Sequence, residues 1–296
     1  MAGPDSAAVR ERRLTVDGIG SRVLETGPED AAEAIVFVHG NPNSADEWRE
    51  LMGQTGALAR SIALDMPGFG RADRPGKEFK VPVEGPAAFL GGALDHLGVQ
   101  RAHLVLHDFG GPWGLAWAAS HPDAFASVVL INTGVLIGFE MHRVGRLWAR
   151  PVVGELLMAA TTRGRFRTAM REANPKLPQR AIDAMYDDYD RGTRRLVLRL
   201  YRNRTNDDLL EAAAAHFATL DRPALVVWGA ADPFVPVRHA EQQRRAFPRA
   251  EVVVLEDSSH WPFLDDPEAV AGAVLPFLRA RVTGDAQGSG TGVGAG

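Results

Sequence analysis

The hydrophobic positions of the chain gather in six short runs, each bounded by turn residues. The runs cover residues 34–38, 61–65, 103–107, 128–132, 224–228 and 251–255. A run without polar alternation is typical of a strand that is covered on both faces. Because segments with helical spacing separate several of the runs, the pattern predicts a parallel sheet of the α/β class.

Residues 13–26 (RLTVDGIGSRVLET) show a different pattern, in which polar and apolar positions alternate around a glycine-containing turn. This pattern predicts a hairpin at an antiparallel edge of the sheet. Helices are expected at residues 85–97, 110–120, 238–247 and 267–280. The last of these follows Asp265 and Asp266 as possible caps and has Pro267 at its first position.

The series of predicted strands is interrupted in the middle of the chain. Residues 134–220 contain 14 Arg and one Lys against ten acidic residues, a local charge of +5, which leaves −9 for the rest of the chain. Its amphipathic segments predict a helical cap over the sheet. The expected organisation is therefore a flexible stretch 1–13, a core 14–133, a cap 134–220, a second core part 221–282, and a Gly-rich disordered tail 283–296.

Composition narrows the class of protein further. The chain has 296 residues, a net charge of −4 and no cysteine, which excludes disulfides, thiolate metal sites and a cysteine nucleophile. It has no signal-like apolar segment at its start and no run of 18 apolar residues, so we expect a cytoplasmic protein without a membrane partner. An acidic balance also argues against nucleic-acid binding. We expect a monomer or weak homodimer without cofactor or metal.

Residues 104–114 (LVLHDFGGPWG) carry the first chemical signal, because an apolar strand runs into a tight turn and a Gly-rich helix start. Asp108 occupies the turn where a nucleophile sits in a strand-to-helix elbow. Asp232 follows the strand at 224–228, and His260 follows the strand at 251–255. Nucleophile, acid and histidine thus occur in the order expected for such a site, each at the carboxyl end of a strand.

The chain resembles the α/β-hydrolase superfamily, and within it the haloalkane dehalogenase and epoxide hydrolase branch, whose elbow reads H-D-x-G as residues 107–110 do here. The resemblance covers residues 14–280 and includes the loops at 39–49 (HGNPNSADEWR) and 65–75 (DMPGFGRADRP). It implies a mostly parallel eight-stranded sheet flanked by helices, with a helical cap inserted after strand 6.

An aspartate nucleophile suits electrophilic sp3 carbon. The carboxylate displaces a leaving group, and the resulting alkyl ester has its carbonyl on the enzyme, where water must attack it. His260 would activate that water and Asp232 would orient the imidazole. The backbone N–H groups of Asn41 and Phe109 would stabilise the oxyanion. Asp257, three residues before His260, is a rival for the acid.

The leaving group separates the two branches. Dehalogenases hold a halide with an Asn after HG, which Asn41 matches, and a Trp after the nucleophile, where this chain has Phe109 without an N–H donor. Trp113 or Trp148 could replace that donor. A dehalogenase acting on a small apolar or amphipathic substrate is the first expectation.

Epoxide hydrolases protonate the opening ring with cap tyrosines, and residues 200–203 (LYRN) resemble their Tyr-Arg motif. Tyr201 is therefore the candidate acid for an epoxide hydrolase. The usual partner in the early cap is missing, since Tyr186 and Tyr189 come later. A ligand-binding protein without catalysis is the third reading.

Overall fold

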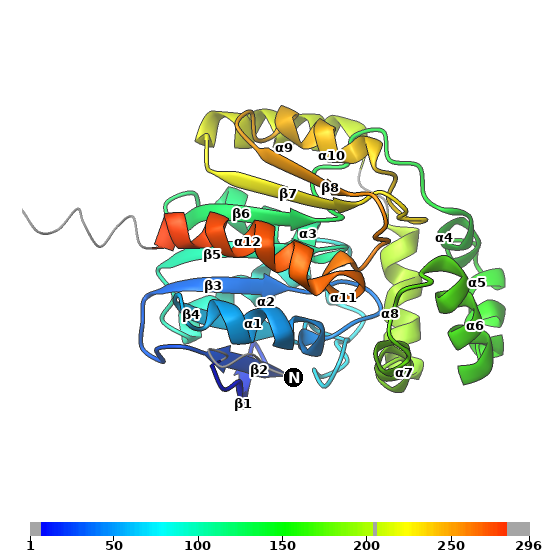
Figure 1. Ribbon diagram of the computed structural model, residues 1–296. Helices are drawn as coiled ribbons and strands as arrows, with labels where there is room; N and C mark the ends of the chain where they lie inside the picture. The colour runs from blue at the N-terminus through cyan, green and yellow to red at the C-terminus, as the bar shows by residue number, and fades with distance from the viewer. Residues whose placement is uncertain (1–6, 204–205, 283–296) are drawn as a thin grey trace, which may run out of the picture.

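The computed structural model describes residues 7–203 and 206–282, and it contains an eight-stranded sheet in the order β1-β2-β4-β3-β5-β6-β7-β8 (Figure 1). The strands are β1 (Arg10–Val16), β2 (Ile19–Thr26), β3 (Glu33–Val38), β4 (Arg60–Leu64), β5 (Arg101–His107), β6 (Phe125–Ile131), β7 (Ala224–Gly229) and β8 (Glu251–Leu255). From β4 to β8 all neighbours are parallel, as the continuous apolar runs predict. The predicted tail, 283–296, lies outside the described residues.

The antiparallel edge of the sheet is also confirmed. β1 pairs with β2, and β2 pairs antiparallel with β4. The turn between β1 and β2 is Asp17-Gly18, and both residues have positive φ (48° and 77°), the geometry of a tight two-residue hairpin. The flexible stretch predicted for residues 1–13 extends too far along the chain, because β1 already begins at Arg10. Regular pairing with β2 begins there, opposite Glu25.

Helices cover both faces of the sheet. Figure 1 shows α1 and α12 on the near face and α2 and α3 behind the strands. The helices of the core are η1 (Ala45–Trp48), α1 (Arg49–Thr55), α2 (Glu84–His96), α3 (Gly110–Ser120), α9 (Asp207–Leu220), α10 (Arg238–Gln242), η2 (Gln243–Arg245), α11 (Pro262–Asp265) and α12 (Pro267–Val282). Asp266 caps the last helix, accepting a bond from the Ala269 N–H (3.1 Å). None of the helices in the described ranges is long and apolar enough to cross a membrane.

The inserted cap is helical, as predicted, and follows β6. It consists of α4 (Arg143–Trp148), α5 (Val153–Ala160), α6 (Arg163–Ala173), α7 (Gln179–Asp187) and α8 (Arg191–Arg202). The predicted end at residue 220 is too late, because α9 belongs to the core. Phe217 of α9 packs edge-on against Phe125 of β6 (6.1 Å between ring centroids) and against Phe247 (5.3 Å).

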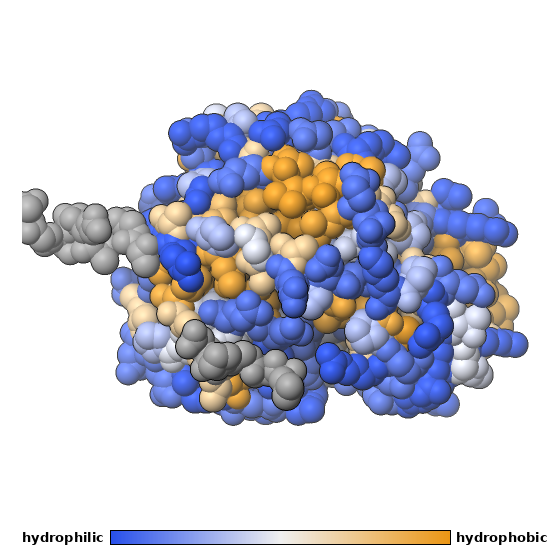
Figure 2. All heavy atoms as spheres, viewed as in Figure 1, coloured by the Kyte–Doolittle hydropathy of each residue, from blue (hydrophilic) through white to orange (hydrophobic). Residues whose placement is uncertain are grey.

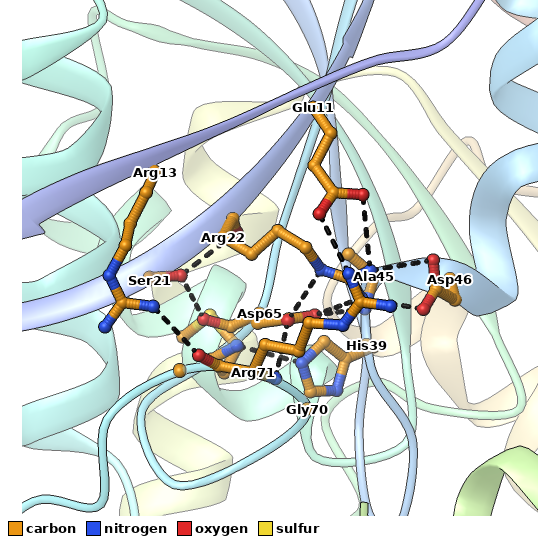
Figure 3. Close-up of polar contacts among 12 residues, drawn as sticks. Glu11, Arg13, Ser21, Arg22, His39, Ala45, Asp46, Asp65, Gly70 and Arg71 are labelled. Atoms are coloured by element: carbon orange, nitrogen blue, oxygen red, sulfur yellow. Dashed lines mark hydrogen bonds and ion pairs between the residues drawn. The ribbon is translucent and has the colours of Figure 1, made fainter.

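A buried ion-pair network ties the N-terminal hairpin to the two loops that border the site (Figure 3). Arg22 of β2 donates through Nε to Asp65 (2.9 Å) and through its other nitrogens to Asp46 (2.8 and 3.0 Å). Asp65 also accepts the backbone N–H groups of Ala45 and Arg71, each at 2.8 Å. These bonds hold residues 39–49 and 65–75 in one arrangement.

Candidate active site

Asp108 lies at the sharp turn between β5 and α3. Its φ of 49° is left-handed, which is uncommon for a residue other than glycine and turns the carboxylate out of the sheet. The turn is tight, since a Cβ on Gly110 would lie 2.1 Å from the Val38 carbonyl oxygen. Thr133, two residues after β6, donates its hydroxyl to the Asp108 backbone carbonyl (2.6 Å). The elbow predicted from the sequence is present in this geometry.

The structure brings Asp108, Asp232 and His260 together from the carboxyl ends of β5, β7 and β8. His260 Nδ1 lies 2.7 Å from Asp232 Oδ2, and its Nε2 lies 3.4 Å from Asp108 Oδ2. The Asp232 and His260 side chains are buried, whereas 15% of the Asp108 side chain is exposed, toward the cavity that it lines. One imidazole thus bridges two carboxylates, with the more accessible one facing the cavity.

Asp232 is fixed by more partners than the sequence indicates. Asn132, which follows β6 and has a φ of 47°, donates its side-chain amide to Asp232 Oδ2 (2.7 Å). The other carboxylate oxygen accepts the backbone N–H groups of Phe234 (2.7 Å) and Val235 (3.0 Å). The rival acid, Asp257, is exposed to solvent, and the histidine contacts Asp232 instead.

The charges of this triad are mutually dependent. Burial alone would lower the pKa of His260, but the charge of Asp232 and the hydrogen bond to Asp108 raise it to about 10. Burial alone would raise the pKa of Asp108, but the hydrogen bond and charge of His260 hold it below its ordinary value. The resting site is therefore an imidazolium between two carboxylates.

Asn41 contributes a backbone donor to the Asp108 carboxylate. Its N–H donates to Asp108 Oδ1 (2.7 Å), so it already points to a carboxylate oxygen. Phe109 precedes the first turn of α3, where backbone N–H groups have no partner inside the helix. His39 of the same loop accepts the Met66 N–H at Nε2 (2.9 Å). The oxyanion-hole roles of Asn41 and Phe109 remain predictions.

A cavity of about 600 Å³ lies between the triad and the cap. Asp108, His260, Asn41 and Tyr201 line its reactive end. Most of the remaining wall is apolar and comes from Phe139, Trp148, Phe166, Met170, Leu200 and Phe234. A cavity of this size and lining suits a small organic molecule with a substantial apolar part.

His142 and Tyr201 form a pair in this cavity that the sequence does not reveal. His142 Nδ1 accepts the Gly145 N–H (3.2 Å), and its Nε2 lies 3.3 Å from the Tyr201 hydroxyl. Burial lowers the pKa of His142 to about 4, so the ring is neutral and its proton resides on Nε2. His142 therefore donates to the Tyr201 oxygen, and the tyrosine keeps its own proton free to donate.

Tyr201 is held in its protonated form. Burial and the negative charge of Asp108 raise the pKa of Tyr201 well above its ordinary value. Its ring packs edge-on against Phe109 (5.6 Å between centroids) and Trp148 (5.1 Å). Tyr189 also lines the cavity, but its hydroxyl lies against the sulfur of Met158 (3.4 Å).

The prediction for Trp113 as a leaving-group donor is wrong. Its indole N–H donates to the Pro82 carbonyl (2.8 Å), and its ring stacks on Phe109 in the core. Trp148 does line the cavity, at the end of α4. Of the two predicted tryptophans, Trp148 alone is placed to face a ligand.

Comparisons with known proteins agree with this fold. Residues 35–273 match the model of the alpha/beta hydrolase family. A cis-3-alkyl-4-alkyloxetan-2-one decarboxylase from Xanthomonas campestris pv. campestris is 29% identical over 290 residues, which cover 90% of this chain and 95% of that protein. A haloalkane dehalogenase loop variant from Bradyrhizobium elkanii superposes with a TM-score of 0.81 at 22% identity, covering 95% of this chain and 99% of that one.

An epoxide hydrolase from Vigna radiata superposes with a TM-score of 0.74 at 19% identity, covering 92% of this chain and 98% of that one. At these identities the two solved structures show a shared fold. The family match spans most of the chain, including the segments that carry Asp108 and His260. The protein is therefore an enzyme of the alpha/beta hydrolase family.

Proposed function

We propose that the enzyme opens a strained carbon–oxygen ring, an epoxide first of all, with Asp108 as the nucleophile, and releases a vicinal diol. The observation that carries this proposal is the protonated Tyr201 hydroxyl in the same cavity as Asp108, with His142 donating to its oxygen. An opening ring oxygen needs a proton, whereas a departing halide needs only N–H donors. The pairing therefore favours an oxygen leaving group.

The reaction balances with the groups present. An Asp108 oxygen forms a bond to a ring carbon, the ring carbon–oxygen bond breaks, and Tyr201 gives its proton to the ring oxygen. Esterification removes the charge of Asp108, one of the two carboxylates that keep His260 protonated. The pKa of His260 then falls, and its proton restores the Tyr201 hydroxyl.

Water completes the cycle. Neutral His260 takes a proton from water as the resulting hydroxide attacks the ester carbonyl of Asp108. The bond between the carbonyl carbon and the ester oxygen then breaks. That oxygen leaves as the second hydroxyl of the diol, with the proton of the newly formed carboxyl group, and Asp108 keeps the oxygen from water. His260 is again an imidazolium and Asp108 again a carboxylate. The backbone N–H of Asn41, already directed at an Asp108 oxygen, would stabilise the oxyanion on that carbonyl.

Dehalogenation is the second candidate, because Asn41 and Trp148 both line the cavity and both carry N–H donors. Phe109, beside the nucleophile, supplies no such donor. The indole N–H of Trp113 already donates to the Pro82 carbonyl. A halide would thus have no side-chain donor from the residue directly beside the nucleophile, and it has no use for the proton that Tyr201 can give to a ring oxygen. The four-membered ring in the name of the Xanthomonas relative is a further strained carbon–oxygen bond to include in tests.

The decisive experiment is to trap the ester. In His260→Gln, water activation is lost, so incubation with 1,2-epoxyalkanes should add the whole epoxide mass to Asp108, as measured by intact-mass and peptide mass spectrometry. With a bromoalkane, the mass added to Asp108 would be that of the alkyl group without bromine. A dialkyl oxetanone is the third substrate to incubate with this variant. Asp257→Asn is the matched control, since this exposed carboxylate lies close in sequence to His260 and should leave turnover unchanged.

Two further variants define the roles. We expect Asp108→Asn to lower kcat by about 10⁴-fold or more, and Tyr201→Phe to lower epoxide turnover by about 10²–10⁴-fold. Tyr201→Phe with full epoxide turnover would exclude the tyrosine as the acid. Saturable binding of all three substrates, with no adduct and no turnover, would instead indicate a binding protein.

A further inference from the structure

The cap carries an exposed apolar surface that no part of the described chain covers. It consists of Val144 of α4 and of Val152, Val153, Leu156 and Leu157 in and beside α5. Val152 and Leu156 are 67% and 65% exposed. In Figure 2 apolar residues reach the right-hand edge of the molecule, where Figure 1 places α4 and α5, with hydrophilic residues around them. We call these five residues the cap surface.

Three residues of the cap surface form a stripe along α5. Val153, Leu156 and Leu157 are spaced three and four residues apart, so they share one side of α5. The other side of this helix is already packed, because Gly154 and Met158 are buried and the Met158 carbonyl accepts a bond from Arg194 (2.7 Å). The helix is therefore apolar on both sides, and only one of them has a partner.

The charges around the cap surface are positive and unpaired. Arg143, Arg146 and Arg150 lie in the same segment, and none has a carboxylate partner within residues 7–203 and 206–282. Glu155, the sole acid in residues 143–160, is paired with Arg202 (2.8 Å). Residues 134–203 contain 13 Arg and one Lys against seven acidic residues, in a chain whose net charge is −4.

We propose that the cap surface binds peripherally to membranes that contain anionic lipids. Exposed aliphatic side chains enter the boundary between headgroups and acyl chains, while the surrounding arginines contact lipid phosphates. A second copy of the chain fits less well, because a twofold contact through this surface would bring the arginines of one copy against those of the other. The binding requires no membrane-spanning helix.

The position of the cap surface connects it to the cavity. The helices that carry it also supply cavity residues, with His142 just before α4, Trp148 at its end and Thr161 just after α5. Apolar substrates concentrate in lipid bilayers. Binding of the cap surface to a membrane would therefore place the cavity near the dissolved substrate. This consequence rests on the proposed function, but membrane binding itself does not.

The test is co-sedimentation of the full chain with vesicles of phosphatidylcholine, with and without phosphatidylglycerol, which reads binding without any turnover. We expect binding to the anionic vesicles that weakens as salt is raised, and little binding to phosphatidylcholine alone. Arg143→Ser with Arg150→Ser should lower the partition coefficient roughly thirtyfold. Leu156→Ser with Leu157→Ser should lower it about tenfold or more.

Matched controls lie on the core. Arg238→Ser and Val254→Ser change one exposed arginine and one exposed aliphatic residue away from the cap, and both should bind like the parent. All of these positions are exposed, so the variants are expected to fold. Absence of binding to every vesicle, equal loss in the controls, or a concentration-dependent dimer that the cap variants abolish would each overturn the proposal.

Discussion

His142 is a buried histidine whose protonation state matters for both the site and the fold. Burial lowers its pKa to about 4, below the value of about 6.5 expected in the unfolded chain. Between these two values the unfolded chain binds a proton that the folded protein excludes. The free energy of unfolding contributed by this residue therefore falls as the pH drops from about 6.5 to about 4.

We predict that His142→Gln removes part of this pH dependence. Urea unfolding between pH 4 and pH 7 should show a flatter profile for the variant than for the parent, because glutamine does not titrate. His216→Gln, at an exposed histidine of α9, is the control and should leave the profile as it is in the parent. Parallel profiles for the parent and His142→Gln would contradict the prediction.

The triad residues can be predicted from the sequence because each one follows an apolar run, and parallel strands deliver their carboxyl ends to one edge. Asn132 and His142 cannot be found in this way. Asn132 acts through a side-chain bond to Asp232, 100 positions away, and His142 acts through a tyrosine 59 positions away. Neither contact leaves a spacing in the chain, because folding alone brings together the two core segments in the first case and the two cap segments in the second.

Among the elements, the crossing of α3 over β3 depends on the absence of one side chain. A Cβ at Gly110 would meet the Val38 backbone oxygen at 2.1 Å and the His39 oxygen at 2.8 Å. Backbone atoms in the middle of a sheet cannot move aside as a flexible side chain can. The helix start, and with it the direction of Asp108, therefore requires glycine at this position.

Gly110→Ala should destabilise the protein by about 3 kcal/mol, as an overpacked core position does, and should lower activity by displacing Asp108. Thermal and urea unfolding measure the first effect. Gly164→Ala is the comparison, because no atom lies within 4 Å of a Cβ at that position in α6, and alanine should stabilise the helix by about 0.5–1 kcal/mol. Equal effects at the two glycines would refute this account.

The elements themselves differ in how far the sequence predicts them. The mostly apolar strands β3 and β6 were predicted within a few residues, because burial on both faces leaves few polar positions. The end of the cap was not, since α9 is amphipathic like the cap helices before it. Phe217 packs on the sheet rather than on the cap, and that choice depends on tertiary contacts with Phe125 and Phe247.

For the whole molecule, the network around Arg22 joins segments that are far apart in the sequence. The Arg22 and Asp65 side chains are 4% and 0% exposed, so neither charge can be left without its partner cheaply. Removing one member of a buried pair leaves the other desolvated and uncompensated. The same network also holds the loop that presents the Asn41 N–H to Asp108.

Arg22→Met should lower the free energy of unfolding by about 3–5 kcal/mol and should reduce kcat as well, because the loop carrying Asn41 loses its support. Arg10→Met removes an exposed ion pair with Glu29 and should cost less than about 1 kcal/mol. Urea titration and turnover of both variants give the comparison. A small effect at Arg22 would show that the network contributes little beyond its hydrogen bonds to the backbone.

The placement of the triad also has a consequence in time. Asp108 is synthesised 152 residues before His260, and Asp232 and His260 follow the last two strands at one end of the sheet. At ordinary rates of translation this interval is on the order of ten seconds. Throughout it the emerging chain has the nucleophile of the proposed mechanism but lacks its base, so that mechanism requires β7 and β8 to join the sheet before turnover begins. In that mechanism, catalytic competence therefore reports that the last two strands of the newly made chain have joined the sheet.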